Sequence, residues 1–209
     1  PPARSQGRQK VIIICQGMPS VPAKKQLLEF FAKKGYWVFH PRYRGSWESK
    51  GSFLRISPHQ DILDIISQLP KGFTELWTSK KFVVQADAIY LLASSFGGSA
   101  GILASRDPRV SKVVALSPVV DWRVESRDEP LDWLREFVKK AYGGGYRFRD
   151  ADWNNLKNAR FYNPVAVQKQ IPAHKILIIH AQDDTIVPWE AVAEFCREIG
   201  CSYYIVKRG

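Results

Sequence analysis

The sequence predicts an α/β fold in which a parallel sheet carries helices on both faces. Short apolar runs alternate with helix-like segments along most of the 209 residues. Some runs are apolar at every position, such as residues 11–14 (VIII) and 176–179 (ILII), which is typical of strands buried on both sides. Because strands that alternate with helices pair in parallel, these two observations together indicate the fold class.

Six strands and four helices account for the regular part of the chain. The strands are expected at residues 11–15, 36–40, 88–93, 110–116, 176–180 and 202–206. The helices are expected at residues 23–34, 57–69, 96–105 and 188–199. Leu27, Leu28 and Phe31 give the first helix an apolar side, and Pro58 suits the first turn of the second.

One long segment, at about residues 121–171, interrupts this alternation. It is rich in Trp, Arg, Asp and Gly and contains the triplet Gly143-Gly144-Gly145. We expect it to form a helical insertion, or cap, between the fourth and fifth strands. Residues 1–209 are then expected to form a single domain that includes this insertion.

A candidate nucleophilic serine lies where the third strand meets the third helix. The chain passes from strand to helix through small residues at 93–101 (ASSFGGSAG), which is the setting of a nucleophile elbow. In that tight turn the residues two before and two after the nucleophile must be small, and Ser95 has Ala93 and Gly97 there. The N-terminus of the following helix favours a negative charge that develops near the hydroxyl group.

Two neighbouring serines are weaker candidates for the nucleophile. Ser94 would place Leu92 and Phe96 at the two critical positions, where their side chains clash. Ser99 gives the literal G-x-S-x-G pattern, but it lies several residues past the strand and is expected inside the helix. A helix of small residues without a catalytic serine is the remaining interpretation.

The segment after the fifth strand supplies the candidate acid. Residues 180–188 (HAQDDTIVP) resemble the H-G-x-x-D-x-x-V-P segment of α/β hydrolases, with Ala181 in place of the glycine. The resemblance implies that Asp184 is the triad acid, which orients the catalytic imidazole and stabilises its cationic form. Asp183, its neighbour, and Asp121, after the fourth strand, are the alternatives.

The loop after the first strand is a candidate oxyanion hole. Residues 14–19 (ICQGMP) resemble the H-G-G-P-type loop of esterases and peptidases, with Gln16 in place of the histidine. The resemblance implies that the backbone N–H groups of Met18 and Phe96 hold the oxyanion. Gly17 is the alternative donor, and an ordinary strand-to-helix turn is the structural alternative.

The loop after the second strand points to one family. Residues 41–46 (PRYRGS) resemble the R-G-S loop of prolyl-oligopeptidase-like serine peptidases and esterases, in which it lines the site beside the oxyanion hole. Tyr43 and Arg44 therefore either anchor this loop or face the substrate. With the elbow and the acid segment, the chain looks most like this family within the α/β-hydrolase superfamily, and dienelactone-hydrolase-like relatives are also compatible. The implied fold is a mostly parallel sheet with a helical insertion after the fourth strand.

The catalytic base has no clear candidate in the sequence. None of the four histidines, His40, His59, His174 and His180, has the expected position. In hydrolases of this type the histidine follows the last strand within a G-H pair, which places it one or two residues after Gly209. The last strand is apolar on both faces and needs a further covering helix. We therefore expect the C-terminal end of the domain to be incomplete.

These motifs predict a serine hydrolase that cleaves a carboxylic ester or a peptide or amide bond through an acyl-enzyme on Ser95. Its substrate is expected to be a small ester or a short peptide. Trp122, Trp133 and Trp153 either shape the acyl pocket or pack the core of the insertion. No cofactor and no metal are expected, since no Cys/His cluster has zinc spacing. The alternative is a non-catalytic α/β-hydrolase relative that binds a ligand or a protein.

Composition and charge argue against other classes. Hydrophobic residues make up 45% and charged residues 24% of the chain, as in soluble globular proteins. The net charge of +11 comes from scattered Lys and Arg residues, so no nucleic-acid partner is expected. No apolar run could span a bilayer, and residues 1–10 carry no export signal. Three cysteines without spaced pairs indicate a reducing compartment, and we expect a cytoplasmic protein without a membrane partner.

Overall fold

The chain forms one six-stranded parallel sheet. The computed structural model describes residues 1–2, 9–158 and 160–209. Most of residues 1–10, in which no export signal was expected, therefore lies outside the described residues. The strands are β1 (Gln9–Cys15), β2 (Tyr36–Phe39), β5 (Ala86–Ser94), β6 (Val110–Leu116), β7 (Ile176–Ala181) and β8 (Ser202–Val206). Their order is β2-β1-β5-β6-β7-β8, and every pair of neighbours is parallel.

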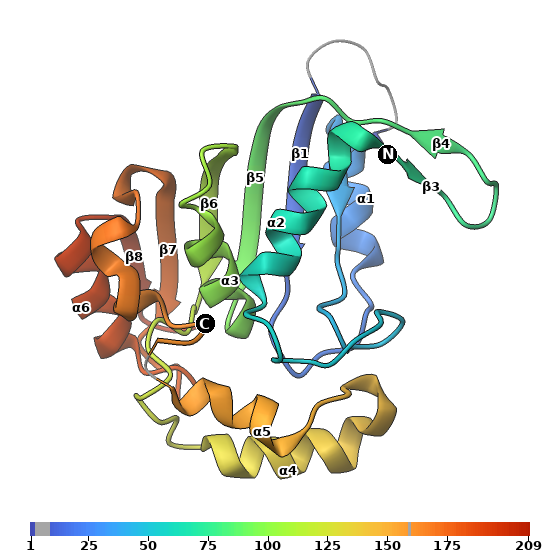
Figure 1. Cartoon of the computed structure of the whole chain (residues 1–209). Helices are drawn as coiled ribbons and strands as arrows, with labels where there is room; N and C mark the ends of the chain where they lie inside the picture. The colour runs from blue at the N-terminus through green and yellow to red at the C-terminus, as the bar shows by residue number, and fades with distance from the viewer. Residues whose placement is uncertain (3–8, 159) are drawn as a thin grey trace.

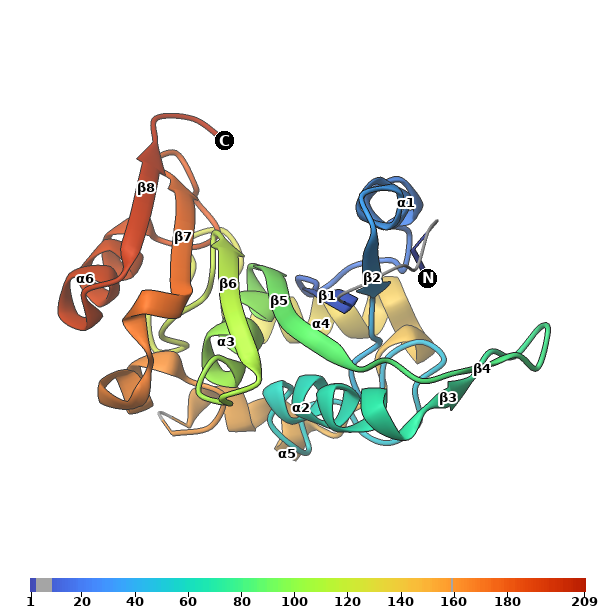
Figure 2. The ribbon, with the colours of Figure 1, turned by 90° about the horizontal axis from the view of Figure 1, so that it is seen from above.

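Helices cover both faces of this sheet. Helix α1 (Lys25–Lys33) lies on one face, and α2 (His59–Gln68) and α3 (Phe96–Ala104) lie on the other (Figure 2). Helix α6 (Trp189–Ile199) packs against β7 and β8. The predicted fold class is thus confirmed. Among the described residues, no helix combines the length and the apolar character needed to span a membrane.

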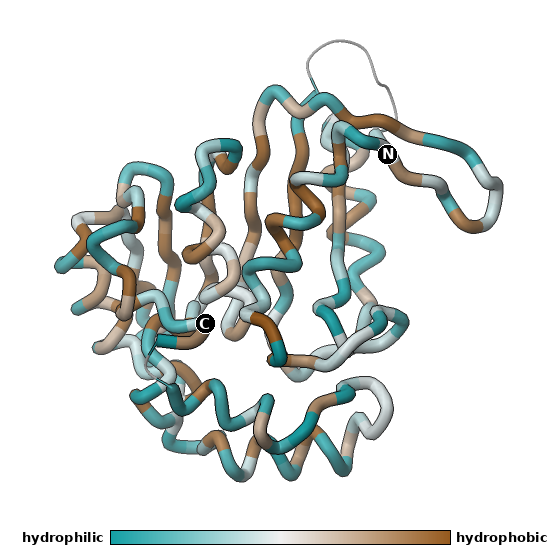
Figure 3. Tube along the Cα trace, viewed as in Figure 1, coloured by the Kyte–Doolittle hydropathy of each residue, from teal (hydrophilic) through white to brown (hydrophobic). Residues whose placement is uncertain are grey.

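The buried strands follow the apolar runs of the sequence. Residues 11–15 of β1 are all buried, as expected for a strand covered on both faces. Figure 3 shows the same pattern, with hydrophobic colour along β1 and β5 and hydrophilic colour on much of the helical surface. The strands β6 and β8 have the predicted bounds, and the other predicted strands differ from the observed ones by at most two residues at either end.

A small hairpin was not expected from the sequence. It consists of β3 (Phe73–Thr74) and β4 (Lys81–Phe82), which pair antiparallel and extend away from the main sheet (Figure 1). It follows the 3₁₀ turn η1 (Leu69–Lys71) at the end of α2. A strand of two residues is too short to show an alternating pattern, so the sequence carries no periodic signal for it.

The helical part of the segment between β6 and β7 lies below the carboxyl ends of the strands (Figure 1), and the last turn of the segment leads into the amino end of β7. Its elements are α4 (Leu131–Tyr142), η2 (Gly143–Gly145), α5 (Asp150–Trp153), η3 (Asn154–Lys157), η4 (Pro164–Gln170) and η5 (Ala173–Lys175). Helix α4 buries Leu131, Leu134 and Val138, spaced as one helical face. The helical insertion therefore stands over the end of the sheet where parallel strands place their functional side chains.

Backbone hydrogen bonds join the insertion to the loop after β2. The N–H group of Trp47 donates to Gly145 O at 2.8 Å, and that of Phe53 donates to Arg147 O at 2.7 Å. Arg147 N–H in turn donates to Gly45 O at 2.7 Å. Only glycine fits at position 45, because an added Cβ would lie 2.1 Å from the nitrogen of Phe53. The loop after β2 and the insertion are therefore held together by backbone hydrogen bonds.

Candidate active site

Ser95 occupies the sharp turn between β5 and α3. Its φ of 49° and ψ of −120° lie in a region that costs a non-glycine residue about 1–3 kcal/mol. Two backbone hydrogen bonds hold the turn, from Ser95 N–H to Leu116 O at 3.0 Å and from Val119 N–H to Ser95 O at 3.1 Å. The strained turn places a partly exposed serine at the N-terminus of α3, which is the geometry of a nucleophile elbow.

Close packing brings the loop after β1 against this turn. A Cβ added to Gly97 would lie 2.1 Å from the carbonyl oxygen of Cys15 and 2.5 Å from that of Gln16. A Cβ on Gly17 would come within 3.2 Å of the Ser95 Cβ. The absence of a side chain at position 97 therefore lets residues 16–18 lie directly beside the serine.

The other two candidate serines have different positions. Ser99 is fully buried inside α3, and its hydroxyl group donates to Val119 O at 2.6 Å. Ser94 is the last residue of β5 and does not line the cavity beside the elbow. Within the described residues, the Ser95 hydroxyl has no hydrogen-bond partner and faces that cavity. Of the three, Ser95 alone is open to a substrate.

The cavity beside Ser95 has a volume of about 60 Å³. Most of its wall is apolar and comes from the insertion and from the segment around the start of α6. Its apolar lining includes Trp122, Leu131, Leu134, Ile186, Val187 and Val192. Besides Ser95, the polar lining consists of Asp121, Ser126 and Glu129. Such a wall suits an apolar group with few polar contacts.

Two free backbone donors lie on the same cavity. Met18 and Phe96 both line it together with Ser95. In the part of the chain that the structure describes, neither residue's N–H group donates a hydrogen bond. Phe96 is the first residue of α3, where the helix leaves its N–H groups unpaired. The two residues expected to form an oxyanion hole therefore line the same cavity as Ser95, with N–H groups that have no partner among the described residues.

Side chains from the loop after β2 hold the oxyanion loop in place. The Tyr43 hydroxyl donates to Gln16 O at 3.2 Å, and His40 Nε2 lies 2.6 Å from Gln16 Oε1. Arg42 Nη1 donates to His40 Nδ1 at 3.1 Å, so the imidazole proton is on Nε2 and points to Gln16. Burial, and then the charges of Arg42 and Lys24, lower the pKa of His40 to about 4. His40 is therefore a neutral structural donor.

Tyr43 and Arg44 both anchor the loop after β2. Tyr43 is buried, and its ring meets that of Phe96 edge-on with centroids 5.4 Å apart. The backbone N–H group of Arg44 donates to Asp61 at 2.8 Å, and its guanidinium pairs with Asp61 and Asp64 of α2. Neither residue lines the cavity beside Ser95, so their positions favour anchoring of the loop over contact with a substrate.

Asp184 is held rigidly at the start of the acid loop. Its Oδ1 accepts hydrogen bonds from the N–H groups of Ile186 at 3.0 Å and Val187 at 2.8 Å. Its Oδ2 lies 3.4 Å from His180 Nε2, and 17% of the side chain is exposed. Asp184 stands behind the cavity wall, since Ile186 and Val187 line the cavity and Asp184 does not.

The two alternative acids have other partners. Asp183 is exposed and accepts a hydrogen bond from Gly209 N–H at 3.1 Å. Asp121 lines the cavity but is bonded to Arg123 at 2.7 Å and to Asn163 at 2.9 Å. Burial raises the pKa of Asp121, but the hydrogen bonds from Arg123 and Asn163 outweigh it and lower that pKa overall. Asp121 is thus a neutralised structural anion.

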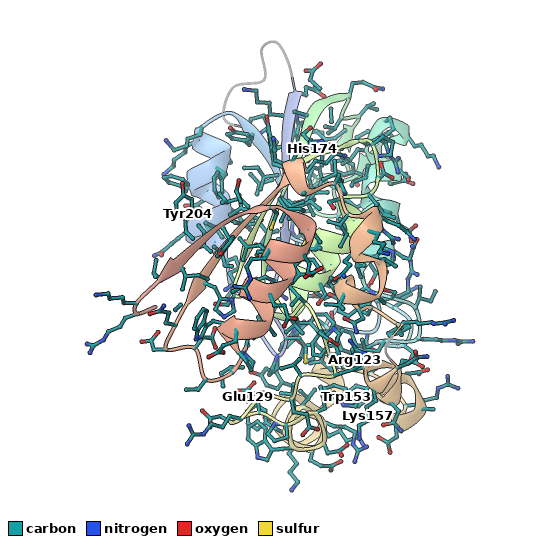
Figure 4. All side chains as sticks on the ribbon, turned by 90° about the vertical axis from the view of Figure 1, so that its left-hand side faces the viewer. Arg123, Glu129, Trp153, Lys157, His174 and Tyr204 are labelled. Carbon is teal, nitrogen blue, oxygen red and sulfur yellow. The ribbon has the colours of Figure 1, made fainter. Side chains whose placement is uncertain are left out.

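In the described part of the chain, no histidine lines the cavity. His180 is buried, and its Nε2 donates to a backbone carbonyl of the acid loop at 2.9 Å. His59 is bonded to its neighbours at the start of α2, and His40 holds the oxyanion loop. His174 is exposed at the opposite end of the molecule from Glu129 (Figure 4).

The three tryptophans of the insertion have three different environments. Trp122 lines the cavity and donates to Tyr162 O at 3.0 Å. Trp153 is fully buried in the core of the insertion, and Trp133 is half exposed on α4. The Tyr162 hydroxyl donates to Phe96 O, which joins the insertion to the elbow. Sequence patterns did not indicate Tyr162, because its role depends on a contact between distant segments.

Glu129 and Ser126 are polar cavity residues that the sequence did not reveal. They belong to the irregular start of the insertion, before α4, where no periodic pattern or motif marks a position. The described residues contain no group of three or more His, Cys, Asp and Glu side chains that could hold a metal ion. The chemistry available at this cavity is therefore that of a serine, two backbone donors and carboxylates.

Comparison with known families identifies the chain. The sequence profile of the prolyl oligopeptidase family matches residues 22–200, which is most of its length. The chain belongs to the prolyl oligopeptidase family. The resemblance seen in the elbow, the acid segment and the R-G-S loop is confirmed. A search of curated proteins finds no match to the sequence.

Solved structures share the fold of this prolyl oligopeptidase family member. An acylaminoacyl peptidase in complex with Z-Gly-Gly-Phe-chloromethyl ketone superposes with a TM-score of 0.65 at 20% identity, over 100% of this chain and 34% of its own. An esterase from Exiguobacterium antarcticum superposes with a TM-score of 0.65 at 17% identity, over 97% of this chain and 85% of the esterase. Mouse α/β hydrolase domain-containing protein 10 superposes with a TM-score of 0.63 at 18% identity, over 98% of this chain and 83% of the mouse protein. The fold is that of the α/β hydrolases.

The chain spans about a third of the acylaminoacyl peptidase, with which it shares the hydrolase domain fold. Esterases and an α/β-hydrolase domain protein are matched over most of their length. At 17–20% identity, these structures show the shared fold.

Proposed function

We propose that this protein is a serine hydrolase that cleaves a carboxylic ester or a peptide or amide bond through an acyl-enzyme on Ser95. One observation carries the proposal: a serine in a strained turn shares a cavity with two unpaired backbone donors, Met18 and Phe96. A turn of this kind costs free energy and persists where its geometry has a use. Family membership agrees with this chemistry.

The proposed reaction assigns a role to each of these groups. Ser95 Oγ attacks the carbonyl carbon while a histidine takes the hydroxyl proton. The carbonyl oxygen becomes an oxyanion that accepts from the N–H groups of Met18 and Phe96, and losing one such donor typically costs ~3 kcal/mol. The leaving alcohol or amine departs with the proton from the histidine. Water then attacks the acyl-enzyme by the same route and frees Ser95.

Asp184 is the proposed partner of the histidine. Its Oδ1 accepts from two backbone donors, and its Oδ2, which lies 3.4 Å from His180 Nε2, is the oxygen that would accept from the catalytic imidazole. Gly209 lies beside this loop, because its N–H group donates to Asp183. In a protein that continues past Gly209, a histidine directly after it would lie next to Asp184, at the carboxyl ends of the strands (Figure 1).

The cavity supports a small ester or a short peptide as the substrate. Its wall is mostly apolar and includes the buried Trp122. The family is named for peptide hydrolysis, whereas several structural neighbours are esterases, so both bond types are included in the proposal.

Hydrolysis by the complete protein tests this function. We expect turnover of 4-nitrophenyl esters of graded acyl length, or of aminoacyl and prolyl 4-nitroanilides, and its loss in Ser95→Ala. The matched control is Ser99→Ala, which removes the buried neighbouring serine and should retain turnover. If the folded complete protein hydrolyses none of these substrates, the hydrolase proposal fails, and the non-catalytic binding module takes its place.

A further inference from the structure

A carboxylate without a partner lies on the wall of the apolar cavity. Glu129 lines the cavity with Ser95, and its side chain is only partly exposed. Within the described residues, its carboxylate makes no hydrogen bond and no ion pair. Its backbone N–H group donates to Ser126 Oγ at 2.9 Å, which fixes this part of the insertion at the cavity wall.

The neighbouring acids differ from Glu129 because each has donors of its own. Asp121 is paired with Arg123 and Asn163, and Asp184 accepts two backbone hydrogen bonds. Figure 4 shows Glu129 and Arg123 at the same end of the molecule, but the Arg123 guanidinium is bonded to Asp121. Glu129 is thus the carboxylate of the cavity that has a vacant position for a donor.

The surroundings of Glu129 favour the approach of a cation. Burial raises the pKa of its carboxyl group, and the charges of Asp128 and Asp184 raise it further. Both effects show that an ionised Glu129 lacks compensation in the folded protein. The chain carries a net charge of +11, yet no Lys or Arg of the described residues lines this cavity. A cation on a bound molecule would supply the compensating positive charge.

We propose that Glu129 is a specificity-determining residue that selects substrates whose acyl group carries an ammonium or guanidinium group. The inference rests on the proposed hydrolase function of Ser95 and assigns its substrate class. The apolar wall packs the methylene groups of such a side chain, and Glu129 pairs with the charge at its end. A lysine-like or arginine-like acyl group satisfies both features of the cavity.

The test compares two esters that differ only in the charge. N-acetyl-lysine and N-acetyl-norleucine 4-nitrophenyl esters have side chains of similar length, and only the first ends in an ammonium group. We expect the complete protein to prefer the lysine ester by about tenfold or more in kcat/KM. In Glu129→Gln this ratio should fall to near unity, because the amide keeps the shape and loses the charge.

Glu125→Gln is the matched control for this experiment. Glu125 lies on the same segment of the insertion but is exposed and does not line the cavity, so its variant should keep the wild-type ratio. A wild-type ratio near unity, or an unchanged ratio in Glu129→Gln, would overturn the role of Glu129. Hydrolysis of neither ester by the folded protein would instead refute the hydrolase function itself.

Discussion

The hydroxyl group of Tyr162 donates a hydrogen bond of 2.7 Å to the carbonyl oxygen of Phe96. Both residues are buried, and their ring centroids lie 4.9 Å apart. Tyr162 belongs to the insertion, whereas Phe96 is the first residue of α3 and a proposed oxyanion donor. The insertion therefore supports the elbow directly, in addition to forming a wall of the cavity.

Removing this hydroxyl group should weaken the elbow. In Tyr162→Phe the ring packing is retained and one buried hydrogen bond is lost, so we expect the free energy of unfolding to fall by about 1 kcal/mol. The turnover number should fall as well, with KM little changed, because Phe96 is a proposed oxyanion donor. Denaturant titration and steady-state kinetics measure the two effects. Tyr142→Phe is the control, since that hydroxyl has no hydrogen bond within the described residues.

Gly97 tests the close approach of the oxyanion loop. In Gly97→Ala the added Cβ would lie 2.1 Å from Cys15 O, so we expect a destabilisation of about 3 kcal/mol or more. Gly144→Ala adds the same methyl group where no atom lies within 4 Å, and it should change stability by less than about 1 kcal/mol. Thermal unfolding of the two variants measures both changes in stability. Equal stabilities would contradict the packing described at the elbow.

The parts of the site that were foreseen have local determinants. The elbow at Ser95 requires small residues two positions away on either side, and those positions are visible in the sequence. The strands β6 and β8 are apolar runs that end at polar residues or turns, so their bounds could be predicted. The segment around Asp184 was assigned as the acid segment from its resemblance to that of α/β hydrolases, and it lies directly after β7 as expected.

The parts that were missed depend on contacts between distant segments. Tyr162 meets Phe96 across 66 positions, and Ser52 meets Asp152 across 100. No periodicity predicts which side chain of an irregular insertion turns towards the elbow, and Glu129 was overlooked for the same reason. The positions of Tyr43 and Arg44 likewise depended on partners in other elements, so the sequence left their anchoring role open.

The identity of the acid can be tested by isosteric substitution. We expect Asp184→Asn to lower kcat by roughly 10³–10⁴-fold, because an amide cannot stabilise the cationic imidazole. Asp183→Asn changes the adjacent exposed carboxylate and should leave kcat within a few-fold of wild type. Ester hydrolysis by the complete protein measures both. A large loss in Asp183→Asn with activity retained in Asp184→Asn would reverse the assignment.

His40 predicts a specific dependence of stability on pH. Its pKa is about 4 in the folded protein, against ~6.5 in an unfolded chain, so between these values only the unfolded chain binds the proton. Stability should therefore fall as the pH drops from about 6.5 to about 4. In His40→Gln this fall should be smaller.

Denaturant titrations across that pH range measure the effect of His40. His174→Gln serves as the control, because His174 is exposed, and it should follow the wild-type pH dependence. If His40→Gln lost stability on acidification as steeply as the wild type, His40 would not be a neutral, partly buried donor in the folded protein.

Covalent labelling of Ser95 tests the central claim most directly. The complete protein is treated with a fluorophosphonate, which reacts with activated serines, and the adduct is located by peptide mass spectrometry. The account predicts an adduct on Ser95 in the wild type and in Ser99→Ala, and no adduct in Ser95→Ala. An adduct on Ser94 or Ser99, or no adduct on the folded wild-type protein, would contradict it.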